Sequence, residues 1–471
     1  MTPPPPTSSS YSPRLRTAVV LCGSGTAGVY QAGVLKALGV AGVKIDVLAG
    51  HGAGVMTALA GAIDGGARLW DPAGPWTSGR LRAAYRWRPA LRAGAIGLLS
   101  AGALLLTPLV LLIAAAVIYA LATLTSLASL TGAAERFVGW YQRILEWLFA
   151  PPILPTILPR AVLLAVVVVV VVLLMAAITA AYREGRRRRW TGGFWWRLLG
   201  APLTAHEPGA LMTDTLWRLV HGASNEPRPA ASEIGRRYVD ILTDNFGQPG
   251  FRELIVAVHD VDGRRDLVGA VLPSSARSSF EARRVPDSPR DAEAVDFTGP
   301  QRNLLTDFLL GAWRLPLATA PHTMAFPLDS YWRGEPHRVC DRPELAIRLV
   351  DEIAAIGVEQ VILVSPAAPA AAPHRLRAEP SSLRSRVGEF VRSVETAAVQ
   401  DALAAARPRF SSVFVIRPDH NPIGPFDFAG VYDEASDRRR TVPELLEQGY
   451  ADTYRQFIEP VVATGDRIEP V

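Results

Sequence analysis

Two stretches decide the fold: residues 17–28 are TAVVLCGSGTAG, and residues 44–54 are KIDVLAGHGAG. In each, a short apolar run leads into closely spaced glycines, and an apolar-periodic segment follows. This pattern predicts a buried strand, a tight turn and a helix, twice in succession. Alternating strands and helices are typical of a parallel α/β sheet, so we expect that fold class.

The second half of the chain continues the same alternation. Short apolar runs predict further strands at Leu254–Val258, Leu267–Leu272, Val361–Val364 and Ser412–Ile416. Helical periodicity predicts helices at Tyr238–Asn245, Pro343–Ile356 and near Val442–Phe457. Polar, proline-containing stretches at 281–300 and 365–385 predict loops.

Composition excludes several classes of protein. With 49% apolar and 20% charged residues among 471, the chain is not disordered. Two cysteines cannot form a disulfide framework or a cysteine-based zinc site, and the eight histidines show no metal-ligand spacing, so we expect no metal and no cofactor. The formal charge of +5 is small for this length and does not favour nucleic acid as a partner. A mean hydropathy of +0.17 indicates that part of the chain lies in lipid.

Two uncharged stretches predict membrane spans. Residues 161–182 form a 22-residue apolar run, roughly 33 Å as a helix and enough to cross a bilayer core. Residues 93–134 are also uncharged, and the most apolar part, about 95–124, predicts the other span, with Pro108 inside it. We therefore expect a two-helix transmembrane hairpin.

Arginines predict the orientation of this hairpin. Five precede the first span and five follow the second, whereas the connection has only Arg136, Arg143 and Arg160. The positive-inside rule then predicts that both soluble parts are cytoplasmic. Because Lys36 and Lys44 are the only lysines beside many arginines, a bias typical of GC-rich bacterial genes, we expect the membrane to be the inner membrane of a bacterial cell. Residues 1–13 lack the apolar region of a signal peptide, which agrees with an N-terminus inside the cell. An arrangement with three spans, which would put the soluble parts on opposite sides, stays open. The aromatic-rich connection predicts an interfacial helix or an aromatic belt.

The domain organisation follows from these segments. Residues 1–16, rich in proline and serine, predict a disordered tail. We expect one α/β domain built from two parts of the chain, residues 17–78 and 200–471. The transmembrane hairpin, residues 79–199, is inserted between them.

The first glycine turn, Gly23 to Gly28, allows three interpretations. Its G-x-G-x-x-G spacing fits a dinucleotide-binding fingerprint, but the second strand ends in Ala49-Gly50-His51 instead of the acid that would hold a ribose. Its backbone N–H groups, backed by a helix N-terminus, also suit an oxyanion hole. A tight turn without a ligand is the third interpretation.

The second turn, Gly50 to Gly54, has the place and spacing of a G-x-S-x-G nucleophile elbow.

Together, GSGTAG with VYQAGVLKAL and DVLAGHGAGVMTAL resemble the patatin-like lipid acyl hydrolases, which include bacterial phospholipases. Segments of 245–263, 311–326, 341–366 and 426–460 also look like patatin segments, so the likeness covers 17–65 and most of 235–460. It implies a three-layer sandwich with a mostly parallel sheet. It also implies a substrate-binding oxyanion loop, which here comprises Gly23, Ser24, Gly25 and Gly28, with His51 beside the elbow.

The chain departs from that family at its catalytic residues. Gly52 stands where the elbow serine belongs, and Ala27 where the family usually has Arg or Lys. The resemblance places the dyad aspartate near Tyr331, where Glu335 is the only nearby carboxylate and the possible acid. Asp64-Gly65-Gly66 spells the aspartate motif but ends the helix after the elbow, where a helix C-cap explains it.

A glycine side chain cannot attack an ester, whereas glycine readily adopts the positive φ of an elbow. We therefore predict a membrane-anchored, catalytically degenerate protein that binds a membrane lipid or acyl chain, or acts as a scaffold. The alternative is an active lipid acyl hydrolase with a non-standard nucleophile, for which Ser24, His51 and Thr57 are the nearby candidates.

Overall fold

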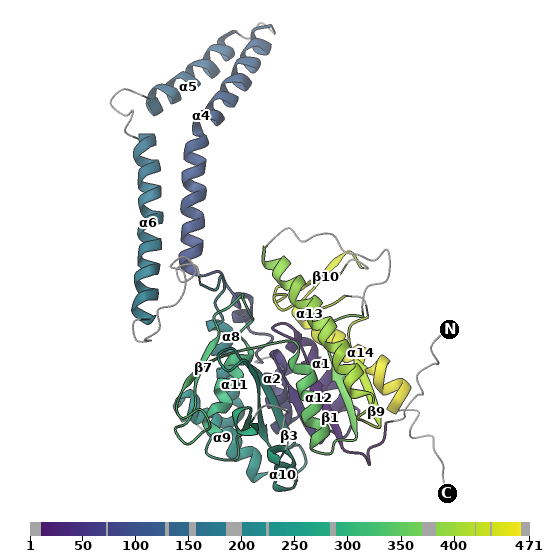
Figure 1. The fold of residues 1–471 in the computed structure, drawn as a ribbon. Helices are drawn as coiled ribbons and strands as arrows, with labels where there is room; N and C mark the ends of the chain where they lie inside the picture. Colours follow the sequence, from purple (N-terminus) through teal and green to yellow (C-terminus); the bar gives the residue numbers. More distant parts are fainter. Residues whose placement is uncertain are drawn as a thin grey trace. The chain divides into compact units, whose positions relative to one another are not determined.

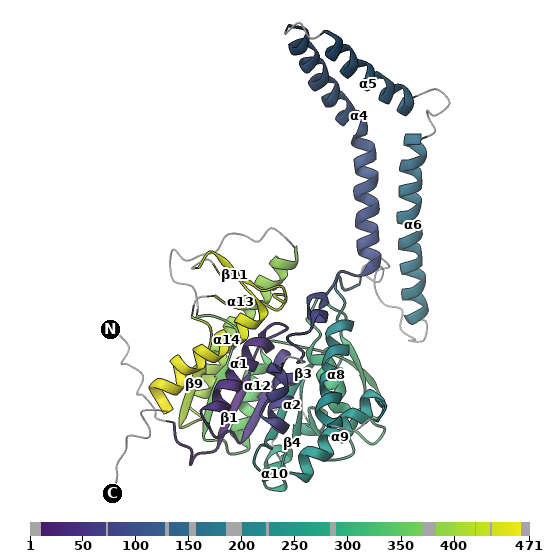
Figure 2. The same ribbon diagram turned by 180° about the vertical axis from the view of Figure 1, so that it is seen from behind.

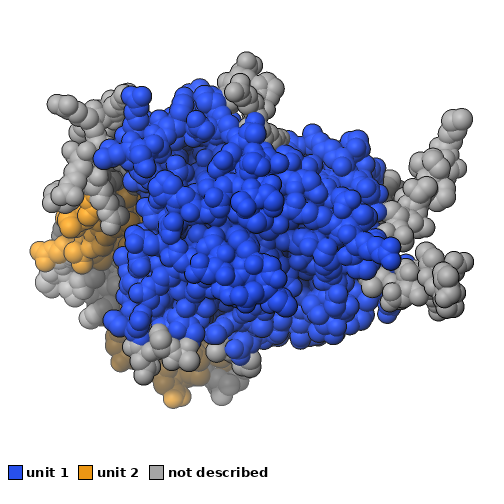
Figure 3. Space-filling model, turned by 90° about the horizontal axis from the view of Figure 1, so that it is seen from below, with its two compact units in different colours: residues 1–86, 203–471 blue, residues 87–202 orange. Residues whose placement is uncertain are grey.

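The computed structural model describes residues 11–71, 74–127, 131–149, 157–184, 200–222, 226–282, 289–369, 383–419, 421–433 and 436–462. The chain divides into two compact units, which Figure 3 colours separately. Unit 1 comprises Met1–Arg86 and Leu203–Val471, and unit 2 comprises Trp87–Pro202. Each unit is described by itself below.

Unit 1 contains a nine-stranded sheet in which seven strands follow the order β5-β4-β3-β2-β1-β8-β9, while β7 pairs with β3 and β6 with β7. The strands are β1 Thr17–Leu21, β2 Val47–Gly50, β3 Glu253–Asp260, β4 Arg265–Val271, β5 Ala294–Asp296, β6 His322–Ala325, β7 Pro336–Cys340, β8 Gln360–Val364 and β9 Ser412–Ile416. The neighbours of β1, β2 and β8 are all parallel, and β4 is parallel to β5. The antiparallel pairs of the described sheet are β3 with β4, β3 with β7 and β6 with β7. The predicted mixed α/β fold with a mostly parallel sheet is confirmed.

Helices cover both faces of this sheet. Alternate residues of β1 belong to different cores, Val19 and Leu21 to one and Ala18 and Val20 to the other, as the two-residue period of a strand requires. The first core is closed by α1 Ala27–Val40, α2 Ala53–Asp64, α8 His206–His221, α9 Ala231–Asp244, α11 Leu305–Ala312 and α14 Val442–Thr453. The second is closed by α10 Ser274–Ala282, α12 Leu345–Ala355 and α13 Leu383–Ala406 (Figure 1).

Shorter elements complete unit 1: helix α3 Ala67–Trp70, the single turns η1 Gly79–Ala83, η2 Arg290–Ala292 and η3 Arg302–Leu304, the π-helical η4 Tyr454–Val462, and a small hairpin of β10 Val431–Asp433 and β11 Arg438–Arg440. The predicted loop at 281–300 contains η2 and β5, since Phe297 and Val295 pack into the core there. Of the predicted loop at 365–385, residues 370–382 lie outside the described residues.

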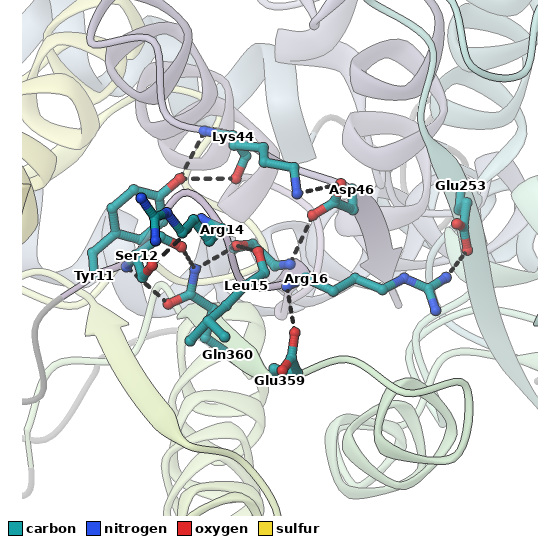
Figure 4. A network of polar contacts seen from close by, with 11 residues as sticks. Tyr11, Ser12, Arg14, Leu15, Arg16, Lys44, Asp46, Glu253, Glu359 and Gln360 are labelled. Atoms are coloured by element: carbon teal, nitrogen blue, oxygen red, sulfur yellow. Dashed lines mark hydrogen bonds and ion pairs between the residues drawn. The ribbon is translucent and has the colours of Figure 1, made fainter.

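The last part of the predicted disordered tail, residues 11–16, is ordered against the sheet (Figure 4). Residues 1–10 lie outside the described residues. The Tyr11 ring is buried against Phe457, and its hydroxyl accepts a hydrogen bond from Lys44 N at 2.8 Å. The Arg16 guanidinium forms an ion pair with Glu253 at 2.5 Å. The composition of residues 1–16 is dominated by serine and proline and predicts disorder. The contacts that order residues 11–16 come from individual side chains such as Tyr11 and Arg16, which a composition does not single out.

Unit 2 consists of α4 Pro89–Leu127, α5 Thr131–Phe149 and α6 Ile157–Glu184. Figures 1 and 2 show α6 beside the first part of α4 and α5 beside its last part. A Cβ on Gly97 of α4 would lie 2.4 Å from Val169 of α6, and the Tyr141 hydroxyl of α5 donates to the Leu111 carbonyl at 2.6 Å.

One helix of unit 2 passes the length and hydropathy test for a membrane span. Among the described residues, α4 is long and apolar enough, with a mean hydropathy of 2.6 over its best window. In α6 only the apolar segment Arg160–Met175 is recognised by the same test, and it falls below the length the test requires. The predicted two-helix transmembrane hairpin is therefore supported for its first helix alone. Arg186 to Arg189, on which the orientation depended, lie outside the described residues.

The buried Tyr11 ring predicts a stability effect. We expect Tyr11→Ala to cost about 2–4 kcal/mol, because it removes a core aromatic and the partner of Lys44 N. Thermal unfolding of the full chain in detergent measures this, with Val40→Ala, an exposed valine at the end of α1, as the control. An unchanged melting temperature for Tyr11→Ala would show that residues 11–16 do not belong to the fold.

Candidate functional site

The two glycine turns meet at one edge of the sheet. β1 and β2 are parallel with Leu21 opposite Gly50, so the turns that follow them lie side by side. The Ala53 N–H donates to the Gly23 carbonyl at 2.9 Å and joins them. Gly23, Gly25 and Gly52 all have positive φ values (117°, 56° and 58°), a region that glycine adopts without strain. The close approach of the two turns therefore depends on glycine at these three positions.

Four polar side chains from distant parts of the chain form a cluster between the turns, here called the buried cluster: Ser24, His51, Asp341 and Glu395. The Ser24 hydroxyl lies 2.6 Å from Asp341 Oδ2 and 2.9 Å from Glu395 Oε1. His51 Nδ1 lies 3.0 Å from Asp341 Oδ1. All four residues are buried, with exposed fractions of 3% or less. Asp341 thus contacts both glycine turns at once.

Glu395 of α13 occupies the first glycine turn. Its Oε1 accepts a hydrogen bond from the backbone N–H of Ser24 at 2.9 Å and lies 2.9 Å from the Ser24 hydroxyl. Pro425 closes the turn from another direction, since a Cβ on Gly25 would lie 2.1 Å from its carbonyl oxygen. An anion-binding arrangement at the start of α1 is therefore filled by a carboxyl group of the protein itself.

Gly52 is the N-cap residue of α2, with φ 58° and ψ −130°, a conformation that would strain any residue with a side chain. A Cβ built on it would lie 2.5 Å from the Gly23 carbonyl oxygen and 2.6 Å from Asp341 Oδ2. Both distances are shorter than Cβ atoms tolerate, and one of the two atoms belongs to the backbone. The elbow therefore has no space for any side chain at this position.

Burial and mutual interaction shift the pKa values within the cluster. Burial alone lowers the pKa of His51, but the charge and hydrogen bond of Asp341, together with Cys22, raise it to about 10. Burial raises the pKa of Glu395 to about 7, against its hydrogen bonds from Ser24. At neutral pH, His51 and Asp341 form an ion pair, and Glu395 is close to its titration midpoint.

The structure brings together most of the residues predicted from the sequence. Gly23, Ser24, Gly25 and His51 lie at the two turns, and Gly28 follows in the first turn of α1, where Trp76 packs against it. Asp64 accepts a hydrogen bond from Gly66 N at 2.8 Å, and Gly65 is left-handed, so this motif ends α2.

Glu335, the acid expected at the elbow, lies elsewhere. Its side chain is 70% exposed and 3.7 Å from His337. The carboxylate beside Gly52 is instead Asp341, which follows β7 where this strand pairs antiparallel with the end of β3. An acidic residue directly after an apolar strand was the available signal for Asp341. Glu395 has no local signal, because it is one of several charged residues in a long helix.

The cluster contains no arrangement for a metal. Within the described ranges, no group of three His, Cys, Asp or Glu side chains could hold one. Two cavities, of about 980 Å³ and about 240 Å³, are lined by residues outside the cluster.

The raised pKa of Glu395 predicts a pH dependence of stability. Because the folded-state pKa is above the ordinary 4.5, the stabilisation is complete below pH 4.5 and is lost as pH rises through about 7. His51 acts in the same direction, from 6.5 up to about 10. We expect the melting temperature of the wild type to fall between pH 5 and 8, because the free energy of unfolding loses on the order of 3 kcal/mol as Glu395 ionises.

Glu395→Gln keeps an acceptor for Ser24 N and removes the titration, so its melting temperature should fall less over this range. The exposed Glu335→Gln is the matched control and should titrate like the wild type. Identical pH profiles for Glu395→Gln and the wild type would contradict a buried, proton-sharing Glu395.

Comparison with known proteins gives little guidance. No protein-family model matches the chain, and no curated protein matches it. Among solved structures, VipD from Legionella pneumophila aligns over 96% of this chain and 68% of its own, with a TM-score of 0.34 and 10% identity. A likeness at this level assigns neither a family nor an activity.

Proposed function

We propose that the chain is a membrane-anchored, non-hydrolytic protein built on a patatin-like scaffold, in which the catalytic centre has become a structural cluster. The observation that carries this proposal is the closed elbow. Position 52 has no nucleophile, and the Gly23 carbonyl and the Asp341 carboxylate fill the space that one would need. Covalent acyl transfer requires a nucleophile at hydrogen-bond distance from its base and in reach of the substrate.

The backbone donors of the turns also support loss of hydrolysis. An oxyanion hole needs N–H groups that are free to bind the developing negative charge. Here the Ser24 N–H donates to Glu395, and the Ala53 N–H donates to the Gly23 carbonyl. Internal acceptors thus occupy both donors in the folded protein.

One observation favours a second candidate, an ester hydrolase that uses Ser24. The Ser24 hydroxyl lies 2.6 Å from Asp341 and 2.9 Å from Glu395, whose pKa of about 7 suits a general base. Either carboxylate could take the hydroxyl proton as the oxygen attacks a carbonyl carbon. Against this candidate stand the burial of Ser24 and the occupied donors.

The two candidates differ in reactivity. We expect the purified full chain to release no product from 4-nitrophenyl butyrate or phosphatidylglycerol vesicles and to resist labelling by a fluorophosphonate probe. Ser24→Ala should behave identically. Labelling of the wild type that disappears in Ser24→Ala would establish the second candidate and refute the first.

Restoring the missing oxygen should not restore activity. We expect Gly52→Ser to show no hydrolysis and a lower melting temperature, because its Cβ would clash with the Gly23 carbonyl. The acid is present as Asp341, so it is the lack of space that prevents catalysis. Gly39→Ser is the matched control, since a Cβ there meets nothing within 4 Å. An active, stable Gly52→Ser protein would show that the elbow is open in solution.

We further propose that α4 anchors the chain and that membrane lipid is its partner. Apolar side chains such as Leu109 and Ile113 are more than half exposed on this helix, which is typical of a lipid-facing surface.

We expect Leu109→Arg combined with Ile113→Arg to move the protein into the carbonate-extractable fraction, because each arginine costs about 2.5–3.5 kcal/mol at the centre of a span. The matched pair Leu109→Ala and Ile113→Ala should stay in the membrane; equal extraction of both pairs would exclude α4 as the anchor.

A further inference from the structure

The two places where the chain passes between unit 1 and unit 2 lie side by side on unit 1. The chain leaves unit 1 after Arg86 and re-enters it at Leu203. The Thr204 N–H donates to the Arg86 carbonyl at 2.9 Å and joins the two segments of this crossing. Helix α4 begins shortly after Arg86, at Pro89. With α4 in a membrane, as proposed above, the crossing is the part of unit 1 that the chain holds at the bilayer surface.

An exposed leucine lies beside this crossing. The Leu203 N–H donates to the Ala318 carbonyl at 2.9 Å, so the loop after α11 packs directly on the re-entry point. Leu317, the preceding residue of this loop, is 87% exposed. It has a φ of 62°, and the Ala318 N–H donates across it to the Pro316 carbonyl at 2.7 Å. A γ-turn with a positive φ at its central residue is rare and strained.

No contact within unit 1 explains the conformation of Leu317 among the described residues. A left-handed backbone is costly for a bulky side chain, whereas glycine would adopt it freely. Leaving a leucine in water also forfeits the stabilisation that its burial would give. Strained residues of this kind cluster where function requires their position. The loop thus holds an apolar side chain away from unit 1, beside the crossing.

The crossing also has positive charge without acidic partners. Arg82 and Arg86 are exposed, and no acid in the part of the chain that the structure describes forms an ion pair with either. The acids of α8, which begins just after the crossing, are already engaged, since Arg80 lies 2.7 Å from Asp214 and 3.7 Å from Glu207. Two guanidinium groups beside the exposed leucine are therefore available to an anion.

We propose that Leu317, Arg82 and Arg86, here called the crossing patch, bind the surface of an anionic bilayer. Leu317 would insert its side chain among the lipid headgroups, and the two guanidinium groups would pair with phosphate oxygens, whose geometry they match. Anionic lipids attract basic residues next to a membrane span in the same way. The proposal rests on α4 as the membrane anchor and adds a second contact, which would restrain unit 1 at the membrane surface.

The test places a solvent-sensitive nitrobenzoxadiazole probe on Ala320→Cys, an exposed position in the same loop. The native Cys22 and Cys340 are buried and should not react. The full chain is reconstituted in phosphatidylcholine vesicles with or without phosphatidylglycerol, each with doxyl lipid as a quencher. We expect quenching and a blue shift of the probe in vesicles that contain phosphatidylglycerol. The same probe on Val40→Cys, at the exposed end of α1, should stay in water.

The apolar part of the crossing patch is tested with a matched pair of leucine variants. Leu317→Gln should reduce quenching of the probe at position 320, because it removes the side chain that inserts. Leu328→Gln should leave quenching unchanged, since it alters a leucine that is as exposed, at 85%, but lies in the connection between β6 and β7. Quenching of Leu317→Gln equal to that of the wild type would overturn the assignment of Leu317.

The charged part is tested with a matched pair of double variants. Arg82→Gln with Arg86→Gln should weaken docking on phosphatidylglycerol vesicles about fivefold for each arginine. Arg14→Gln with Arg407→Gln removes the same charge from exposed positions elsewhere on unit 1 and should dock as the wild type does. Equal docking of the wild type with and without phosphatidylglycerol, or equal weakening by both pairs, would overturn the assignment to an anionic lipid.

Carbonate extraction of the same vesicles separates this inference from the anchoring role of α4. A chain that carbonate removes would refute the anchor and, with it, the crossing patch. A chain that resists carbonate while the probe at position 320 stays in water would overturn the crossing patch alone. Shielding of the probe that grows with protein concentration in detergent would also overturn it, because a second copy of the chain would then cover this surface.

Discussion

The Gly23 carbonyl oxygen accepts a hydrogen bond from Ala53 N–H at 2.9 Å, and the arrangement of the candidate site depends on this bond. It holds the turn after β1 against the turn after β2 so closely that position 52 can be occupied by glycine alone. It also fixes the start of α2 and the direction of α1, since both helices leave from these turns. In a hydrolase, the same two turns would have to leave room for a serine and a substrate carbonyl. Here they are in contact.

Interactions among the four residues of the buried cluster offset the free-energy cost of burying their charges. Moving a charge into the interior costs several kcal/mol, and an uncompensated one would unfold a marginal protein. Asp341 is balanced by protonated His51, and Glu395 approaches neutrality because burial raises its pKa to about 7. Ser24 bridges the two carboxyl groups. The four residues thus connect the turns after β1 and β2 with the end of β7 and with α13, which lie about 290 and 370 residues further along the chain.

The N-terminal segment adds long-range contacts to unit 1. The Tyr11 ring belongs to the first core, its hydroxyl accepts from Lys44 N, and Arg16 pairs with Glu253. Residues 11–16 are thus tied to the segment before β2, to β3 and to η4 by single contacts from distant parts of the chain.

Local patterns of apolar periodicity and turn residues were enough to predict the α/β class, the mostly parallel sheet, both glycine turns and the apolar helix α4. Which acid lies beside Gly52 depends on long-range contacts instead. Asp341 reaches the two turns through the antiparallel pairing of β7 with β3, and Glu395 reaches Ser24 through the packing of α13. The order of residues 11–16 was equally invisible, since it depends on partners such as Lys44, Glu253 and Phe457. Local sequence encodes backbone preference, whereas the closure of the elbow results from distances between segments that only folding brings together.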